Sequence, residues 1–188
     1  MMSGGSTAPN GTNEPTYNPI TVVNGVGTAQ ITLVNATPTT LTGTSGSVSR
    51  NTSAIIVNPA VASQITLTSD KTAINANGTD IATVTAQLKD AFGNNNLTSG
   101  VNIAFSAPRG TVVTSPVLTN GSGQAMTTFN SGTDRNSGNV IITASSTGLV
   151  SGIKTITFND VTAPSAPIIT APIIITYTNA SNYTITGT

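Results

Sequence analysis

Apolar and polar positions alternate with a period of two through residues 63–160, which predicts short β-strands. In residues 81–88, Ala82, Val84, Ala86 and Leu88 fall on one face and threonine and glutamine on the other. The next rows predicted to face inward are Val101, Ile103 and Phe105; Ala125, Thr127 and Phe129; Val140, Ile142 and Ala144; and Ile156 and Phe158. Residues 64–68 open the series, and residues 112–113 and 117–118 form short pieces interrupted by Pro116. Seven or so strands at this spacing predict an all-β fold, an immunoglobulin-like β-sandwich.

Part of the alternating pattern occurs twice in the chain. The segment NGVGTAQITLVN starts at Asn24 and NGSGQAMTTFN starts at Asn120, 120 − 24 = 96 residues later. Residues 41–58 then match residues 142–159 at an offset of 101, and the difference falls in the loop-forming run NSGTDRNSG. A period near 100 residues indicates a tandem array of sandwich domains. We therefore expect the same turn in both copies, with Asn-Gly accepting the positive φ of a hairpin.

The repeat divides the chain into three parts. Residues 63–160 form a complete unit, residues 1–62 hold the closing strands of a preceding repeat, and residues 161–188 form a proline-rich junction with the opening strands of a following repeat. In the first part, the residues expected to line one side of a core are Ala29, Ile31, Leu33, Leu41, Ile55 and Val57. Half a sandwich exposes apolar surface and strand edges, so both ends are expected to be loosely ordered or to pair with another segment.

Composition narrows the chemistry. The 188 residues carry six basic and six acidic side chains and contain no Cys, His or Trp, whereas Thr and Asn number 36 and 20. A chain without net charge has no electrostatic attraction for nucleic acid, and the sequence shows no apolar run long enough to insert into a membrane. Disulfides and thiolate metal sites are excluded. The neutral polar composition favours an extracellular protein.

Three segments resemble the bacterial immunoglobulin-like repeats of the invasin/intimin type: SQITLTSDKTAINANGTDIATVTAQLKDAFGNN, VNIAFSAPRG and TNGSGQAMTTF. The final segment is similar to a different immunoglobulin-like repeat. The resemblance implies a structural spacer in the stalk of a prokaryotic cell-surface adhesin or secreted surface protein. Its partners would be the adjacent immunoglobulin-like domains. A host-cell, neighbouring-cell or glycan receptor would be reached only through other domains, and other parts of the protein would anchor it to the outer membrane or cell wall.

The residue types do not favour catalysis. Without His or Cys, a carboxylate pair would have to act, and Asp80 and Asp90 flank one long strand and should lie at its opposite ends. No catalytic or cofactor-binding residue is nominated, and the chain is expected not to be an enzyme. A glycan-binding or enzyme-accessory module is one alternative, but it usually presents aromatic platforms, and Phe105, Phe129 and Phe158 are in inward register. A filament subunit that uses strand complementation is a second alternative.

Calcium is the one cofactor that the sequence suggests. Asp160 and the pair Asp90 and Asn94 carry oxygen ligands at the predicted domain ends, where extracellular arrays bind Ca²⁺ through six to eight oxygens. One carboxylate for each junction is few for such a site. The alternative is that these side chains form Asx turns.

Overall fold

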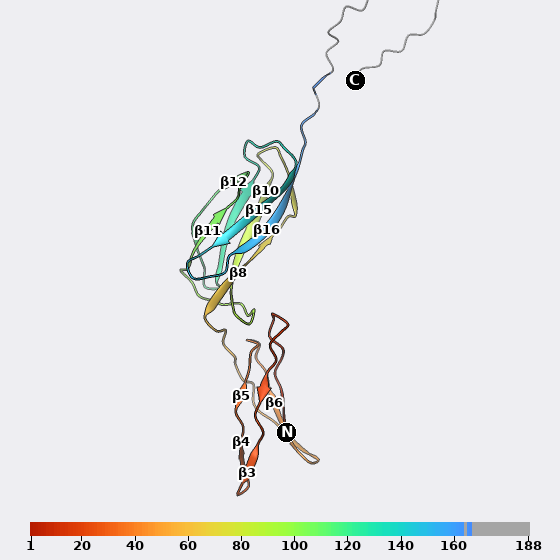
Figure 1. Cartoon of the computed structure of the whole chain (residues 1–188), viewed down its shortest axis with the longest axis vertical. Helices are drawn as coiled ribbons and strands as arrows, with labels where there is room; N and C mark the ends of the chain where they lie inside the picture. Colours follow the sequence, from red (N-terminus) through yellow and green to blue (C-terminus); the bar gives the residue numbers. More distant parts are fainter. Residues whose placement is uncertain (164, 167–188) are drawn as a thin grey trace, which may run out of the picture.

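The computed structural model describes residues 1–163 and 165–166, and every regular element in them is a β-strand. Two folded regions follow one another along the longest axis of the molecule (Figure 1). We call residues 1–61 the head unit and residues 62–160 the central unit. The predicted opening strands in residues 167–188 lie outside the described residues.

The central unit is a sandwich of two sheets, as the alternation predicts. One sheet has the strand order β12-β14-β10-β8, built from β12 (Thr111–Val112), β14 (Gln124–Asn130), β10 (Ile81–Asp90) and β8 (Ala62–Ser69). The other has the order β13-β11-β15-β16-β9, built from β13 (Val117–Leu118), β11 (Asn102–Ser106), β15 (Gly138–Ser145), β16 (Gly152–Asn159) and β9 (Ala73–Asn75). All neighbours are antiparallel except β16 and β9, which run parallel.

The core lies between these sheets and contains the predicted inward rows. Every second residue of β10 from Ala82 to Leu88 is buried, and so are the inward positions of β11, β14, β15 and β16. The rings of Phe129 and Phe158 stack across the core with their centroids 5.7 Å apart. Each large side chain buried in this way contributes about 1.5–3 kcal/mol relative to exposure. Strand β9 was not predicted, because only Ile74 of its three residues is buried and so short a strand shows no alternation.

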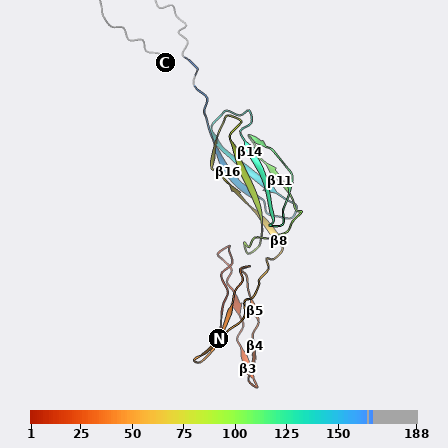
Figure 2. The ribbon, with the colours of Figure 1, turned by 180° about the vertical axis from the view of Figure 1, so that it is seen from behind.

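The chain enters and leaves the sandwich at opposite ends. A parallel bridge joins Gln64, near the start of β8, to Val150, just before β16. Both strands therefore begin at the end that faces the head unit, and β16 carries the chain away from it to Asn159. Seen from the front and from behind, the residues after β16 leave from the end opposite the head (Figures 1 and 2).

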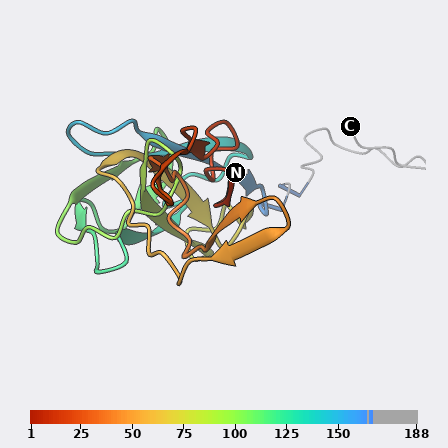
Figure 3. The same ribbon diagram turned by 90° about the horizontal axis from the view of Figure 1, so that it is seen from below.

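The head unit is built from shorter strands. A three-stranded sheet has the order β1-β6-β7, formed by β1 (Met2–Gly4), β6 (Leu41–Ser45) and β7 (Val48–Asn51). Two further pairs are β2 (Thr16–Tyr17) with β5 (Ile31–Thr32), and β3 (Thr21–Val23) with β4 (Val26–Thr28). In the view from below, the β6–β7 hairpin is seen as two orange arrows (Figure 3).

Burial in the head unit is slight. Its buried apolar residues are Ala8, Val34 and Leu41. Of the six residues predicted to line the core, Leu41 is buried and the other five are half-buried. By contrast, Val22, Val23 and Val26 remain 64%, 63% and 68% exposed.

The prediction that both copies of the repeated motif form the same turn is wrong. In the first copy, Asn24 and Gly25 both have positive φ (51° and 79°) and form a two-residue hairpin between β3 and β4. In the second copy, positive φ occurs only at Gly123 (69°), and Asn120 instead accepts hydrogen bonds at its Oδ1 from the N–H groups of Ser122 and Gln124. A Cβ on Gly123 would overlap the Asn96 carbonyl, so the packing as well as the positive φ requires glycine at this position.

Candidate functional site

The junction between the two units is organised by the loop that follows β10, residues 90–94 (Asp-Ala-Phe-Gly-Asn). Asp90 is fully buried there and accepts four hydrogen bonds, each of 2.9 Å. Its Oδ1 accepts from the backbone N–H groups of Phe92 and Asn94, which closes the loop. Its Oδ2 accepts from Asn94 Nδ2 and from the N–H of Ala60, which lies in the connection between the units. One carboxylate therefore fixes both the loop and the incoming chain.

The pKa of Asp90 reflects this arrangement. Burial alone would raise it, but the hydrogen bonds from Asn94, Ala60 and Phe92 outweigh burial and lower the pKa below its usual value. The carboxylate is therefore ionised at neutral pH and retains all four acceptor positions.

Asn94 reaches across the junction into the head unit. Its Nδ2 donates to the Val34 carbonyl at 3.0 Å, and its Oδ1 accepts from the Ala36 N–H at 2.8 Å. A carbonyl and the N–H two residues later point to the same side of an extended chain. One side-chain amide thus satisfies both the Val34 carbonyl and the Ala36 N–H, which lie beyond the end of β5.

Gly93 allows a second segment of the head unit to approach the loop. The Asn10 N–H donates to the Phe92 carbonyl at 2.9 Å, and Asn10 Nδ2 donates to the Ala91 carbonyl at 3.2 Å. Gly93 has a φ of +85°, and a Cβ at this position would lie 2.9 Å from the Asn10 backbone nitrogen. Glycine is therefore required both by the backbone conformation and by the contact.

The segment that connects the two units is also hydrogen-bonded to the central unit outside the junction loop. Asn96 Nδ2 donates to the Ala60 carbonyl at 2.8 Å, so both polar backbone groups of Ala60 are bonded to the central unit. Gln64 Nε2 donates to the Asp90 carbonyl at 3.0 Å. The chain therefore passes from one unit to the next through a fixed backbone rather than a free linker.

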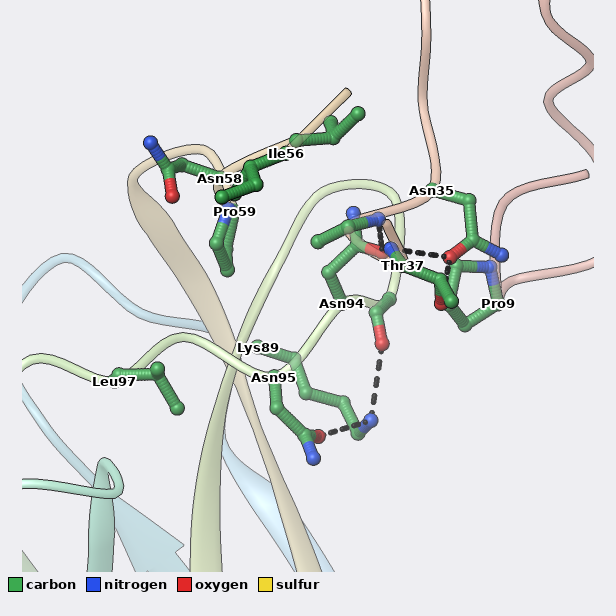
Figure 4. A pocket seen from close by; sticks show the side chains of 13 residues that line it. Pro9, Asn35, Thr37, Ile56, Asn58, Pro59, Lys89, Asn94, Asn95 and Leu97 are labelled. Carbon is green, nitrogen blue, oxygen red and sulfur yellow. Dashed lines mark hydrogen bonds between the residues drawn. The ribbon is translucent and has the colours of Figure 1, made fainter. Parts of the chain in front are cut away.

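An open groove of about 510 Å³ lies beside these contacts and is lined by both units (Figure 4). Among its lining residues in the described chain, Lys89 is the only charged one, and its Nζ donates to the Gly93 carbonyl at 3.0 Å and to Asn95 Oδ1 at 2.9 Å. The ammonium group therefore braces the loop. Asp80 lies at the other end of β10 from Asp90 and pairs with Lys71, so the two carboxylates lie apart, as the sequence predicts.

The structure places the three calcium candidates at two ends of the central unit. Asp90 and Asn94 lie together, but their side-chain oxygens accept the N–H groups described above, and a cation would have to displace these donors. Asp160 lies at the opposite end, where its Oδ1 accepts from the Thr162 N–H at 2.7 Å, a contact that lowers the Asp160 pKa. The described residues contain no cluster of three or more acidic, His or Cys side chains. Calcium binding stays an untested prediction.

The head-unit side of this junction carries a repeat that the sequence analysis missed. Residues 7–12 (TAPNGT) match residues 106–111 (SAPRGT) at an offset of 99. The two glycines of this match, Gly11 and Gly110, have φ values of +74° and +77°, so the loops share a backbone conformation. Pro9 and Asn10, which contact the junction loop, are therefore part of the repeated unit. Comparing residues 7–12 with residues 106–111 would have identified them from the sequence.

The family model described as invasin, domain 3 matches residues 61–161, more than half of the chain. The chain belongs to the invasin domain 3 family. The matched segment spans the whole sandwich and includes the junction loop. Membership of this family indicates an adhesin-like domain of a bacterial surface protein and confirms the predicted resemblance. A search of curated proteins finds no match.

Solved structures provide a comparison of fold. A glycosyl hydrolase family 2 member from Bacteroides cellulosilyticus is 20% identical, with a TM-score of 0.51 over 71% of this chain and 19% of that chain. The D00-D0 domain of intimin is 19% identical, with a TM-score of 0.49 over 85% of this chain and 84% of the other. The C-terminal 282-residue fragment of intimin, in complex with the translocated intimin receptor's intimin-binding domain, is 24% identical, with a TM-score of 0.42 over 53% and 33%.

The chain thus spans about a fifth of the length of the glycosyl hydrolase that it matches. At 20% identity this likeness supports the β-sandwich fold and carries no inference about activity. Within residues 1–163 and 165–166 no helix is present that could cross a membrane.

Proposed function

We propose that the chain is a spacer segment of a prokaryotic surface adhesin or secreted surface protein, in which consecutive immunoglobulin-like units are held in line to position a distal binding domain. The observation that carries the proposal is the junction. It joins the two units through hydrogen bonds that connect Asp90, Phe92 and Asn94 with three separate segments, around Ala60, Asn10 and Val34 respectively. Three separated attachments resist bending in more than one direction, whereas a single linker resists none.

The path of the chain supports the same role. Because the chain enters the central unit at Ala62 and leaves after Asn159 at the other end, successive units of this kind add length. The mechanism is mechanical, so no side chain is assigned to catalysis. We assign contact with a receptor to other domains of the protein.

The proposal is tested by the distance between two spin labels, one on each unit. The chain has no cysteine, so Ser49→Cys in β7 and Thr155→Cys in β16, both exposed, give two unique attachment sites. We expect a single narrow distance distribution in the otherwise unchanged chain, and a broader one when Gly93→Ala is added.

The matched control is Gly100→Ala. Gly100 also has a positive φ, of +79°, but a Cβ there would meet open space, so it adds backbone strain without a junction clash. The distribution should remain narrow in this control. A broad distribution in the parent chain would show that the units reorient freely, and the spacer would then not be stiff.

A further inference from the structure

Four asparagines of the chain are followed directly by glycine: Asn10, Asn24, Asn77 and Asn120. In such a pair the glycine nitrogen can attack the side-chain carbonyl carbon of the asparagine, because glycine has no Cβ to hinder the approach. The attack closes a succinimide ring and expels the side-chain nitrogen as ammonia. Water then opens the ring at either carbonyl and leaves aspartate or isoaspartate. The reaction needs no enzyme and no reactant other than water.

The turn around Asn10 holds the reacting groups of this pair apart. The Gly11 N–H donates to the Ala8 carbonyl at 2.9 Å, so the attacking nitrogen is engaged. Asn10 Oδ1 accepts from the Thr12 N–H at 3.0 Å, and Asn10 Nδ2 donates to the Ala91 carbonyl at 3.2 Å, so the side-chain amide is fixed through both of its polar atoms. Asn10 is nevertheless exposed to water. Deamidation therefore requires only that this turn opens locally.

The turn is stabilised by the junction. The Asn10 N–H donates to the Phe92 carbonyl at 2.9 Å, and its Nδ2 bonds the carbonyl of the residue before Phe92. Both acceptors belong to the junction loop, residues 90–94. Separating the two units removes both bonds and frees the Asn10 side chain, so the closed junction protects Asn10 from deamidation.

Among the four pairs, only Asn10 donates a side-chain hydrogen bond from one unit to the other. Asn77 and Asn120 accept backbone N–H groups at Oδ1, and an aspartate at either position would keep these bonds. Asn24 lies at the tip of the β3–β4 hairpin, at the end of the head unit far from the central unit (Figure 1).

Deamidation of Asn10 would reverse the polarity of its contact with the junction loop. A carboxylate oxygen would replace Nδ2 and face the Ala91 carbonyl and Asn13 Oδ1, which are both hydrogen-bond acceptors. Two hydrogen bonds would be lost, and three oxygens without a donor would face one another. In isoaspartate the main chain would also run through the former side chain, which lengthens the turn. Either product disfavours the closed junction.

We propose that Asn10 is a self-modification site that acts as a one-way latch on the junction. Asn10 stays intact while the units are in contact. When they separate for long enough, it deamidates, and the product does not restore the closed state. The inference rests on the proposed role of the junction in holding consecutive units in line.

The first test follows deamidation of Asn10 and Asn24 by peptide mass spectrometry during incubation at mildly alkaline pH. Because Gly93→Ala forces the loop away from Asn10, the ratio of the Asn10 rate to the Asn24 rate should rise about 5- to 30-fold, the change in the open population expected from the strain of a left-handed alanine. The matched control, Gly100→Ala, should leave this ratio unchanged. Equal ratios in Gly93→Ala and the unchanged chain would overturn the protection of Asn10.

The second test asks what the product does to the junction. In the chain labelled at Ser49→Cys and Thr155→Cys, Asn10→Asp should broaden the distance distribution, and the matched change Asn24→Asp should leave it narrow. A narrow distribution in Asn10→Asp would refute the latch and leave the spacer role standing. A broad distribution in the labelled chain with Asn10 intact would instead refute the stiff spacer.

Discussion

The Asn-Gly-x-Gly motif occurs in both units, yet the two copies fold differently. In the head unit it forms a two-residue hairpin between β3 and β4, and every residue of these two strands is exposed. In the central unit the turn leads into β14, which lies between β10 and β12 and in which buried positions alternate with half-buried or exposed ones. The comparison shows that the sequence of the turn permits several conformations and that the neighbouring strands select one.

The same difference extends to energetics. The central unit buries a continuous cluster that includes three phenylalanines, whereas the head unit buries only Ala8, Val34 and Leu41 among its apolar residues. Most of the free energy of folding should therefore come from the central unit, and the head unit should depend on it through the junction. The predictions below test this dependence.

Separating the units should have the largest effect. Residues 61–163 expressed alone should fold cooperatively, because the complete two-sheet core is present. Residues 1–61 alone should not fold, because their apolar surface is too small to offset chain entropy. Circular dichroism with urea titration measures both fragments. A cooperative transition in the isolated head fragment would contradict this dependence.

Phe129→Ala should destabilise the central unit by about 3–5 kcal/mol, since the ring is fully buried and stacks on Phe158. Ile31→Ala, at a half-buried position of the head unit, is the matched change and should leave the main transition within about 0.5 kcal/mol. Chemical denaturation of the full chain gives both values. Similar losses for both variants would mean that the two cores contribute equally.

Gly93→Ala should weaken the attachment of the head unit. Both this change and Gly100→Ala carry the strain of a left-handed alanine, about 1–2 kcal/mol. Only Gly93→Ala also forces a Cβ against the Asn10 backbone. Limited proteolysis of residues 1–61 should therefore be faster in Gly93→Ala than in Gly100→Ala. Equal rates of cleavage would show that the junction does not protect the head unit.

Acid should destabilise the central unit modestly. Hydrogen bonding by Arg109 lowers the pKa of Asp134 to about 2, and that of Asp90 is also lowered. Because the pKa of Asp134 is depressed in the folded state, its stabilising contribution is present above the unfolded pKa of about 4 and is lost as the pH falls towards 2. Asp134→Asn should flatten this part of the urea-midpoint curve against pH. An unchanged slope between pH 4 and 2 would exclude the Arg109–Asp134 pair as its source.

Much of the fold could be predicted from the sequence. Period-two alternation located the core because one face of each long strand is buried, and β10 shows this along its whole length. Strand β9 and the two different turns could not be predicted, since a three-residue strand has no period and the turn is selected by strands distant in sequence.

The site was predicted only in part. Asp90 and Asn94 were selected for their oxygens, as calcium ligands at a domain end. The structure places them at such an end, but as acceptors and donors of hydrogen bonds to the neighbouring unit. Their partners, such as the Ala36 N–H and the Val34 carbonyl, are backbone groups that every residue carries, so no residue type marks them.

Amide hydrogen exchange on residues 1–166 tests most directly whether a complete sandwich supports an incomplete head unit through their junction. The slowest exchange should occur in β10, β14, β15 and β16. The Asn10 and Ala60 amides, which donate to the junction loop, should be protected to an intermediate degree, and the amides of residues 21–28 should exchange fastest. Gly93→Ala should speed exchange at Asn10 without changing β10. Uniform protection across both units, or no protection at Asn10 and Ala60, would contradict the claim that the central unit supports the head unit through the junction.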